Sequence, residues 1–171
     1  LHYGMQLGSG TWDLMPRLTY NGGHASWQWG AQVDARVHVE RRNDDGYRPG
    51  DRWQASLWSG YQWLPWLGTT LRTSYAGQGH VRGRFAPHAQ VDVPTGTVTE
   101  LPNAIAGPMD DTASNGGRYW DLGLGIDIAV PFGRLRGSHF TFEWVEPLRD
   151  HVHGWQLERS TQVNAAWSVM F

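Results

Sequence analysis

Cysteine is absent from this chain of 171 residues, which excludes disulfide frameworks, thiolate metal sites and cysteine nucleophiles. Long apolar runs are missing as well, and none approaches the roughly 20 residues that a membrane-spanning helix needs. The opening residues Leu1, His2, Tyr3 and Gly4 have neither an initiating methionine nor the charged and apolar regions of a signal peptide. Neither sign of charge is in large excess, and the net charge is -2. The 14 basic and 16 acidic residues lack the basic clustering that a nucleic-acid partner requires, so no such partner is expected.

Glycine and tryptophan, in contrast, are abundant, with 22 and 11 residues, and aromatic residues make up 13% of the chain. The mean hydropathy of -0.51 is typical of a soluble protein. A transmembrane β-barrel has a similar average, because its strands alternate lipid-facing apolar residues with polar residues that face the lumen. The pattern along the chain is therefore more informative than the average.

Apolar and polar residues alternate with a period of two, which predicts β-strands. In residues 25–40 one face is apolar, beginning with Trp27 and Trp29, and the other is polar, from Gln28 to Glu40. A helix would scatter these residues around its circumference, whereas a strand gathers them into one apolar and one polar face. Further strands are expected at residues 52–63, 67–75, 119–130, 139–145 and 161–171.

A weaker strand is expected at residues 11–20, where Pro16 interrupts the pattern. Proline has no backbone N–H and costs a ladder hydrogen bond, so it indicates a bulge or an unpaired edge.

The final strand has the most diagnostic pattern. Its apolar positions are Val163, Ala165, Trp167, Val169 and Phe171. A C-terminal Phe that closes an alternating strand resembles the signal by which the outer-membrane assembly machinery recognises its substrates. We therefore expect that machinery and membrane lipids as partners, and the bacterial outer membrane as the location.

The lengths of the connections provide an independent test. If Phe171 lies on the periplasmic side, the connections at 131–137, 64–66 and 21–24 are periplasmic, and all three are short. The connections at 147–154, 41–51 and 77–117 are then extracellular, and the last is very long. This asymmetry is expected of outer-membrane barrels. Within the longest loop, Val91, Val93, Val98 and Leu101 predict a short hairpin. The loop as a whole is interpreted either as an ordered cap or as a mobile segment.

Together these patterns predict an all-β fold, an antiparallel up-and-down transmembrane β-barrel formed by residues 1–171 as part of a single domain. Seven strands are counted, whereas bacterial barrels use an even number and usually at least eight. We therefore expect an incomplete barrel, the C-terminal part of a larger one, which by itself is either unstable or forms a curved open sheet.

Five segments of the chain share their sequence pattern with a known family. They are residues 3–14 (YGMQLGSGTWDL), 18–20 (LTY), 46–52 (GYRPGDR), 121–125 (DLGLG) and the terminal strand. Together they resemble the outer-membrane transporter-like family named after the meta-pathway of phenol degradation. The resemblance covers nearly the whole chain. It implies an outer-membrane barrel that serves as a channel for small or hydrophobic compounds, and it implies no catalytic residue and no cofactor.

Polar residues on the lumen-facing side of the strands are the candidate functional residues, because such residues set the selectivity of a pore. The alternative is that they pair with one another and fill a closed interior. The candidates are Gln28, Gln32, Asp34, Arg36, His38, Gln54, Arg72, Asp121, Asp127, Glu143, Gln162 and Asn164.

Other motifs favour simpler interpretations. His151 and His153, two residues apart in a predicted loop, lack an evident third metal ligand and are interpreted as solvated histidines. Ser138 and His139 face opposite sides of a strand, which disfavours a catalytic triad, and no enzymatic activity is expected. The tryptophans lie on the apolar face or near turns, where interface anchoring explains them better than sugar or nucleic-acid stacking.

The leading functional hypothesis is passive passage of small-molecule cargo across the outer membrane. A structural or surface-binding barrel that transports nothing is the second hypothesis. A soluble β-sandwich with an aromatic surface is the third.

Overall fold

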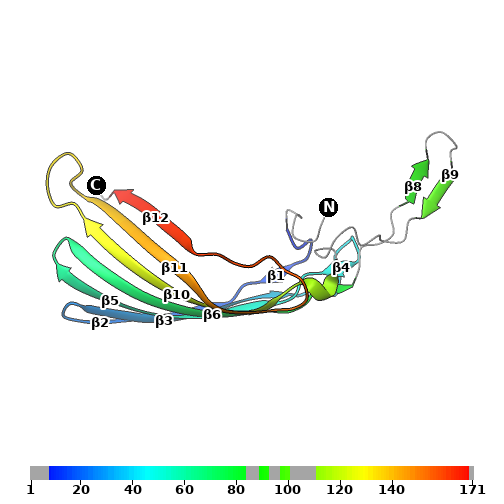
Figure 1. Cartoon of the computed structure of the whole chain (residues 1–171), viewed down its shortest axis with the longest axis horizontal. Helices are drawn as coiled ribbons and strands as arrows, with labels where there is room; N and C mark the ends of the chain where they lie inside the picture. Colours follow the sequence, from blue (N-terminus) through cyan, green and yellow to red (C-terminus); the bar gives the residue numbers. More distant parts are fainter. Residues whose placement is uncertain (1–7, 84–88, 93–96, 101–110, 170–171) are drawn as a thin grey trace.

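The computed structural model describes residues 8–83, 89–92, 97–100 and 111–169, and its main body is a curved antiparallel sheet (Figure 1). The all-β class is thereby confirmed. The eight strands of this sheet are β1 (Asp13–Leu14), β2 (Arg17–His24), β3 (Trp27–His38), β5 (Arg52–Leu64), β6 (Leu67–Gln78), β10 (Gly117–Ala129), β11 (Ser138–Val152) and β12 (Gln162–Val169).

The strands follow one another across the sheet in chain order. β1 and β2 both pair with β3, and the order then continues through β5, β6, β10 and β11 to β12. Every pair is antiparallel. The sheet is not closed: within the residues that the structure describes, β2 and β12 are each paired on one side only.

Pro16 divides the first strand of this meander into β1 and β2. β1 pairs with Val37 and His38, and β2 begins at Arg17, opposite Asp34. The Pro16 carbonyl still accepts a hydrogen bond from Ala35 N at 3.1 Å, so the chain stays beside β3 across the break. The expected irregularity at this proline is confirmed. The strand itself runs on to His24, four residues beyond the predicted end at Tyr20.

Two predicted connections were misplaced. The first turn lies at residues 25–26 and not at 21–24, because β2 pairs with β3 as far as His24 opposite Trp27. β11 has 15 residues and extends to Val152, whereas the predicted strand ended at Val145. The ladder between β10 and β11 shifts register at Trp120/Asp121. This bulge restores pairing beyond Pro147, so the connection begins at His153 and not at Pro147.

Shorter strands lie in the connections. β4 (Tyr47–Arg48) pairs with β7 (Arg82–Gly83), and β8 (Ala89–Asp92) pairs with β9 (Thr97–Glu100). In the latter pair Val91 lies opposite Val98, which confirms the predicted hairpin, while Val93 and Leu101 lie outside the described residues. A 3-10 helix, η3 (Thr112–Ser114), precedes β10, and Asp111 caps it through Ala113 N.

Few large apolar side chains are buried in the described part of the chain, where Tyr47, Ala76 and Val81 form the buried hydrophobic set. Most large apolar residues of the strands are exposed. Leu57 is 60% exposed and Leu124 is 51% exposed. Within the described residues, no second layer therefore covers the face of the sheet that carries these apolar side chains.

Candidate functional site

The register assigns all twelve candidate polar residues to the same face of the sheet, called here the polar face. Gln32 on β3 lies opposite Ser56 on β5, Ser56 opposite Ser74 on β6, and Ser74 opposite Asp121 on β10. Further along β11 and β12, Glu143 lies opposite Asn164. Since residues opposite one another in a ladder share a face, these side chains form rows across the strands. That the rows line a lumen remains a prediction.

The polar face is the more sheltered of the two faces. Short residues on it are buried, such as Gly30, Ser56 and Ser74, while the larger side chains of the other face are exposed. This difference is expected when the polar face is the inner side of a curved sheet, where side chains converge.

Arg72 and Glu143 form the central ion pair of the polar face. Arg72 Nε donates to Glu143 Oε1 at 2.6 Å and Nη2 donates to Oε2 at 2.8 Å, so the pair is bidentate. The two residues belong to β6 and β11, and β10 passes between them at Gly123. A Cβ atom there would lie 2.7 Å from Glu143 Oε1, so glycine provides the space for the crossing. Asn164 on β12 donates more weakly to Glu143, at 3.4 Å.

Arg159, in the connection between β11 and β12, forms a second cluster of the polar face. This cluster lies at the end of the sheet where the long connections leave it, called here the long-loop end. The opposite end, where the short turns lie, is called the tight-turn end. Its guanidinium donates to Asp150 at 2.6 and 2.9 Å and to Asp121 at 2.5 and 3.2 Å. It also lies over the Tyr119 ring, 4.8 Å from the centroid. The hydrogen bonds to Asp150 and then those to Asp121 raise the pKa of Arg159 above its usual range, so this cation is fixed.

His38 is the centre of a third cluster, at the long-loop end of β3. It is buried, its ring Nδ1 lies 3.2 Å from Asp51 Oδ1, and its backbone N donates to the same oxygen at 2.9 Å. Its Nε2 lies 3.7 Å from Asp13, and Arg48 donates to Asp51 at 2.7 Å. Burial acts to raise the pKa of Asp51, but the two bonds from His38 and the charge of Arg48 outweigh it, so the pKa is lowered.

The remaining candidates are paired more loosely. Gln32 Nε2 donates to Asp34 at 3.0 Å, and Arg52 donates to Gln54 at 3.2 Å. Arg36 has a 54% exposed side chain and lies 3.7 Å from Asp13. At the tight-turn end, Gln28 and Asp127 line a cavity of about 380 Å³, and Thr141 donates to Asp127 at 3.2 Å. Gln162 lies on the exposed strand β12, opposite Val145.

Sequence reasoning missed several members of this face, including Trp58, Tyr119 and Arg159. Trp58 lies opposite Gly30 and covers it so closely that a Cβ at Gly30 would be 2.2 Å from Trp58 Cζ2. Alternation with Gln54 and Ser56 assigns Trp58 to this face, and that signal was available. Tyr119, which lies opposite Ala76, could have been assigned to this face by the same alternation. Arg159 could not, because it belongs to a connection with no periodic pattern.

The opposite face, called here the apolar face, carries aromatic side chains at both ends. At the tight-turn end Trp27 contacts Tyr61 with ring centroids 4.8 Å apart, and Tyr61 contacts Trp63 at 4.6 Å. At the long-loop end Trp53 contacts Tyr75 at 5.5 Å. Trp53 and Tyr61 are eight residues apart on β5, about 26 Å along a strand at ~3.3 Å per residue. At a strand tilt of ~35–45° this spacing projects to about 19–22 Å along the membrane normal, somewhat less than the ~25 Å apolar band of outer-membrane barrels.

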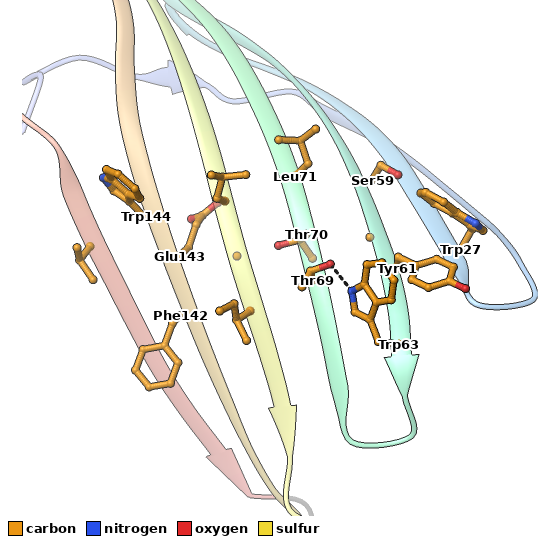
Figure 2. Close-up of a pocket in the computed structure, with 15 residues that line it drawn as sticks. Trp27, Ser59, Tyr61, Trp63, Thr69, Thr70, Leu71, Phe142, Glu143 and Trp144 are labelled. Carbon is orange, nitrogen blue, oxygen red and sulfur yellow. Dashed lines mark hydrogen bonds between the residues drawn. The ribbon is translucent and has the colours of Figure 1, made fainter.

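A groove of about 620 Å³ runs across the apolar face (Figure 2). Trp27, Tyr61 and Trp63 lie on one side of it, and Phe142 and Trp144 on the other. Trp63 Nε1 donates to Thr69 Oγ1 at 2.8 Å, so the polar atom of the indole is satisfied within the protein. The lining of the groove is mostly apolar, and its polar members are Ser59, Thr69, Thr70 and Glu143.

The residues proposed as an assembly signal alternate as expected on β12. Val163 lies opposite Trp144, Ala165 opposite Phe142, and Trp167 opposite Phe140, with the last two rings 6.2 Å apart. Val169 lies opposite Ser138, and Phe171 lies outside the described residues. The geometry is that of an exposed strand with one apolar face, and recognition by a partner remains a prediction.

The His151 and His153 motif is not a loop motif in the structure. His151 belongs to β11, opposite Arg118, whereas His153 follows the strand and stacks on His80 at 4.0 Å. Across the described part of the chain no group of three His, Cys, Asp or Glu side chains is arranged to hold a metal ion. Ser138 is buried at the start of β11, and His139 lies opposite Ala129.

No protein-family model matches this chain, and neither a curated protein nor a solved structure matches it. In the described residues, no helix is both long enough and apolar enough to cross a bilayer.

Proposed function

We propose that this chain forms part of a bacterial outer-membrane β-barrel whose polar face lines a passage for small molecules. The observation that carries the proposal is the division of the sheet into two faces. One face has paired polar side chains such as Arg72 and Glu143, and the other exposes an apolar band with aromatic residues at both ends.

The exposed apolar band needs a cover, because apolar surface in water costs about 25 cal/mol per Å². A soluble β-sandwich would cover the band with a second sheet, and the described residues contain no such layer. Lipid acyl chains cover it equally well. In lipid every backbone N–H and C=O must be paired, so the edges at β2 and β12 would be joined through further strands in a closed barrel.

Cargo of low charge fits the polar face best. Its cations and anions lie close together, as in Arg159 with Asp121 and Asp150, so neither sign of charge dominates. Small neutral compounds, including hydrophobic and aromatic ones, are the proposed class, in agreement with the resemblance to the phenol meta-pathway family. No catalysis is proposed.

A barrel that transports nothing is the second candidate. The specific observation in its favour is the number of cross-strand bonds on the polar face. Arg72 to Glu143 spans β10, and Arg159 bridges Asp121 and Asp150. If the closed barrel is narrow, such pairs fill the interior and stabilise it without leaving a path.

Two measurements on the gene product that contains this chain test the proposal. Outer-membrane fractions are first run on a gel with and without heating, and a heat-dependent mobility shift in that fraction is expected of a folded barrel. The purified protein is then added to planar lipid bilayers, where discrete conductance steps are expected. A shift without conductance supports the non-transporting barrel. A soluble protein without a shift would overturn the membrane assignment and favour a β-sandwich.

A further inference from the structure

Three basic side chains lie together on the apolar face, at its long-loop end. Arg118 on β10 lies directly opposite His151 on β11, and Trp120 lies opposite Arg149. On the other side of β10, Trp120 lies opposite Tyr75. These five residues line a hollow of about 280 Å³. We call Arg118, Arg149 and His151 the basic patch.

The basic patch has no acidic partner in the described part of the chain. Arg118 and Arg149 are exposed, with neither an ion pair nor a hydrogen bond there, and His151 has a single contact, 3.4 Å from the Asp150 carbonyl. The arginines of the polar face differ, since Arg72 and Arg159 both form bidentate pairs.

Glu146 is the nearest acidic residue on the same face of β11. It lies opposite Leu122, and its Oε2 accepts a hydrogen bond from Thr161 at 2.6 Å. The hollow does not include Glu146. The positive charge of the patch is therefore unbalanced by side chains around the hollow.

Aromatic side chains border the patch on the side nearer the apolar band. Trp120 Nε1 donates to Thr73 Oγ1 at 2.8 Å, and Tyr75 contacts Trp53. Indole and phenol groups concentrate at the boundary between lipid tails and headgroups. Along β10, Leu122, Leu124 and Ile126 continue the same face into the apolar band. The order is thus cations, then aromatic rings, then aliphatic side chains.

We propose that the basic patch binds the phosphate of a lipid headgroup, with the acyl chains of the lipid lying along the apolar face below Trp120. This inference rests on the proposed membrane location. Guanidinium groups pair with phosphate through two parallel hydrogen bonds. Two arginines match the charge of a phosphomonoester, about −2, and the His151 ring adds a further N–H that can donate to it. In the headgroup layer, a phosphate supplies the counter-charge that the protein does not.

Binding is tested on the gene product that contains this chain, purified in a neutral detergent. Native mass spectrometry counts bound dioleoyl phosphatidic acid, with dioleoylglycerol as the matched lipid without phosphate. The double variant Arg118→Gln, Arg149→Gln is expected to weaken phosphatidic acid binding at least tenfold. The control is Arg134→Gln, Arg136→Gln, which removes two exposed arginines from the connection at the other end of β10 and is expected to leave binding unchanged.

The outcomes are distinguishable. Equal binding of both lipids, or equal losses in the two double variants, would overturn the phosphate site while a heat-dependent mobility shift still supports the barrel. Complete displacement of phosphatidic acid by millimolar inorganic phosphate would identify a free-anion site and overturn the lipid assignment. If the unaltered protein fails to enter detergent micelles or membranes, the proposed location fails first, and the fractionation records that separately.

Discussion

Glu143 on β11 accepts both hydrogen bonds of the Arg72 guanidinium from β6, so one ion pair spans three strands of the polar face. The Arg72 side chain is 33% exposed and that of Glu143 is 21% exposed, so the pair is partly desolvated. If the proposed barrel is correct, charge at such a position would affect both ion passage and stability.

Removal of one partner should therefore change ion selectivity. In Glu143→Gln the guanidinium of Arg72 loses its counter-charge, so anion passage is expected to rise relative to cation passage. The reversal potential in a planar bilayer under a KCl gradient measures this ratio. The reciprocal exchange Arg72→Glu, Glu143→Arg is expected to return the potential toward that of the unaltered protein. Identical potentials for all three proteins would mean that ions do not pass along this face.

Gly30 should tolerate no side chain while Trp58 is present. A Cβ at Gly30 would lie 2.2 Å from Trp58 Cζ2, so Gly30→Ala must displace the indole or bend β3. A loss of about 1–3 kcal/mol is expected for such overpacking. The temperature at which the folded form disappears from unheated gels is the measurement. Gly60→Ala is the control on the same face, because its Cβ would meet its nearest atom at 3.3 Å. Equal effects of the two substitutions would refute a specific clash with Trp58.

Ala25 should be replaceable by glycine with a gain in stability. It occupies the turn between β2 and β3 with φ of 52°, a left-handed conformation that costs a residue with a Cβ about 1 kcal/mol. Ala25→Gly is expected to gain roughly 0.5 kcal/mol in urea unfolding, after the added flexibility of the unfolded chain is subtracted. Ala31→Gly, in the middle of β3, is the contrasting variant and is expected to lose about 0.5–1 kcal/mol. Destabilisation by both would contradict the strained turn.

Asp51 should make the long-loop end of the sheet sensitive to acid. Its pKa in the folded state is lowered from 3.8, so its contribution to stability is complete above that value and is lost as pH falls through the folded pKa. The difference in urea midpoint between the unaltered protein and Asp51→Asn is expected to be larger at pH 6 than at pH 3. Asp44→Asn, in the same connection, is the control. A pH-independent difference would exclude the bonds from His38 as the cause.

Alternation predicted the central strands because each of their residues has an unambiguous face. β3 and β6 keep one phase from end to end, and β5 keeps it as far as Gln62, so Trp27 and Gln28 could be assigned to opposite faces without coordinates. The polar face followed from the same rule. The open, curved form of the sheet agrees with the expectation for seven meandering strands, in which β1 and β2 count as one.

The long-loop end was less predictable for two physical reasons. The bulge between β10 and β11 leaves Leu148 without a partner in the ladder, so the phase changes and Arg149 and His151 join the apolar face. A period-two rule cannot anticipate such an added residue. Arg159 reaches Asp121 from a connection whose path depends on side-chain hydrogen bonds and not on periodicity. The basic patch and the Arg159 cluster therefore required the structure.

The order of the strands has a directional consequence. Neighbours in the meander run in opposite directions, so β2 and β12, at its two edges, run in the same direction. If these edges were joined to each other, they would form a parallel pair with slanted hydrogen bonds, in conflict with every other ladder of the sheet. A seam that keeps the antiparallel pattern takes an odd number of inserted strands. The minimum is a single strand that runs in the direction opposite to both edges. Where this strand pairs with β12, its apolar residues would have to lie on the same face of the sheet as Val163 and Trp167.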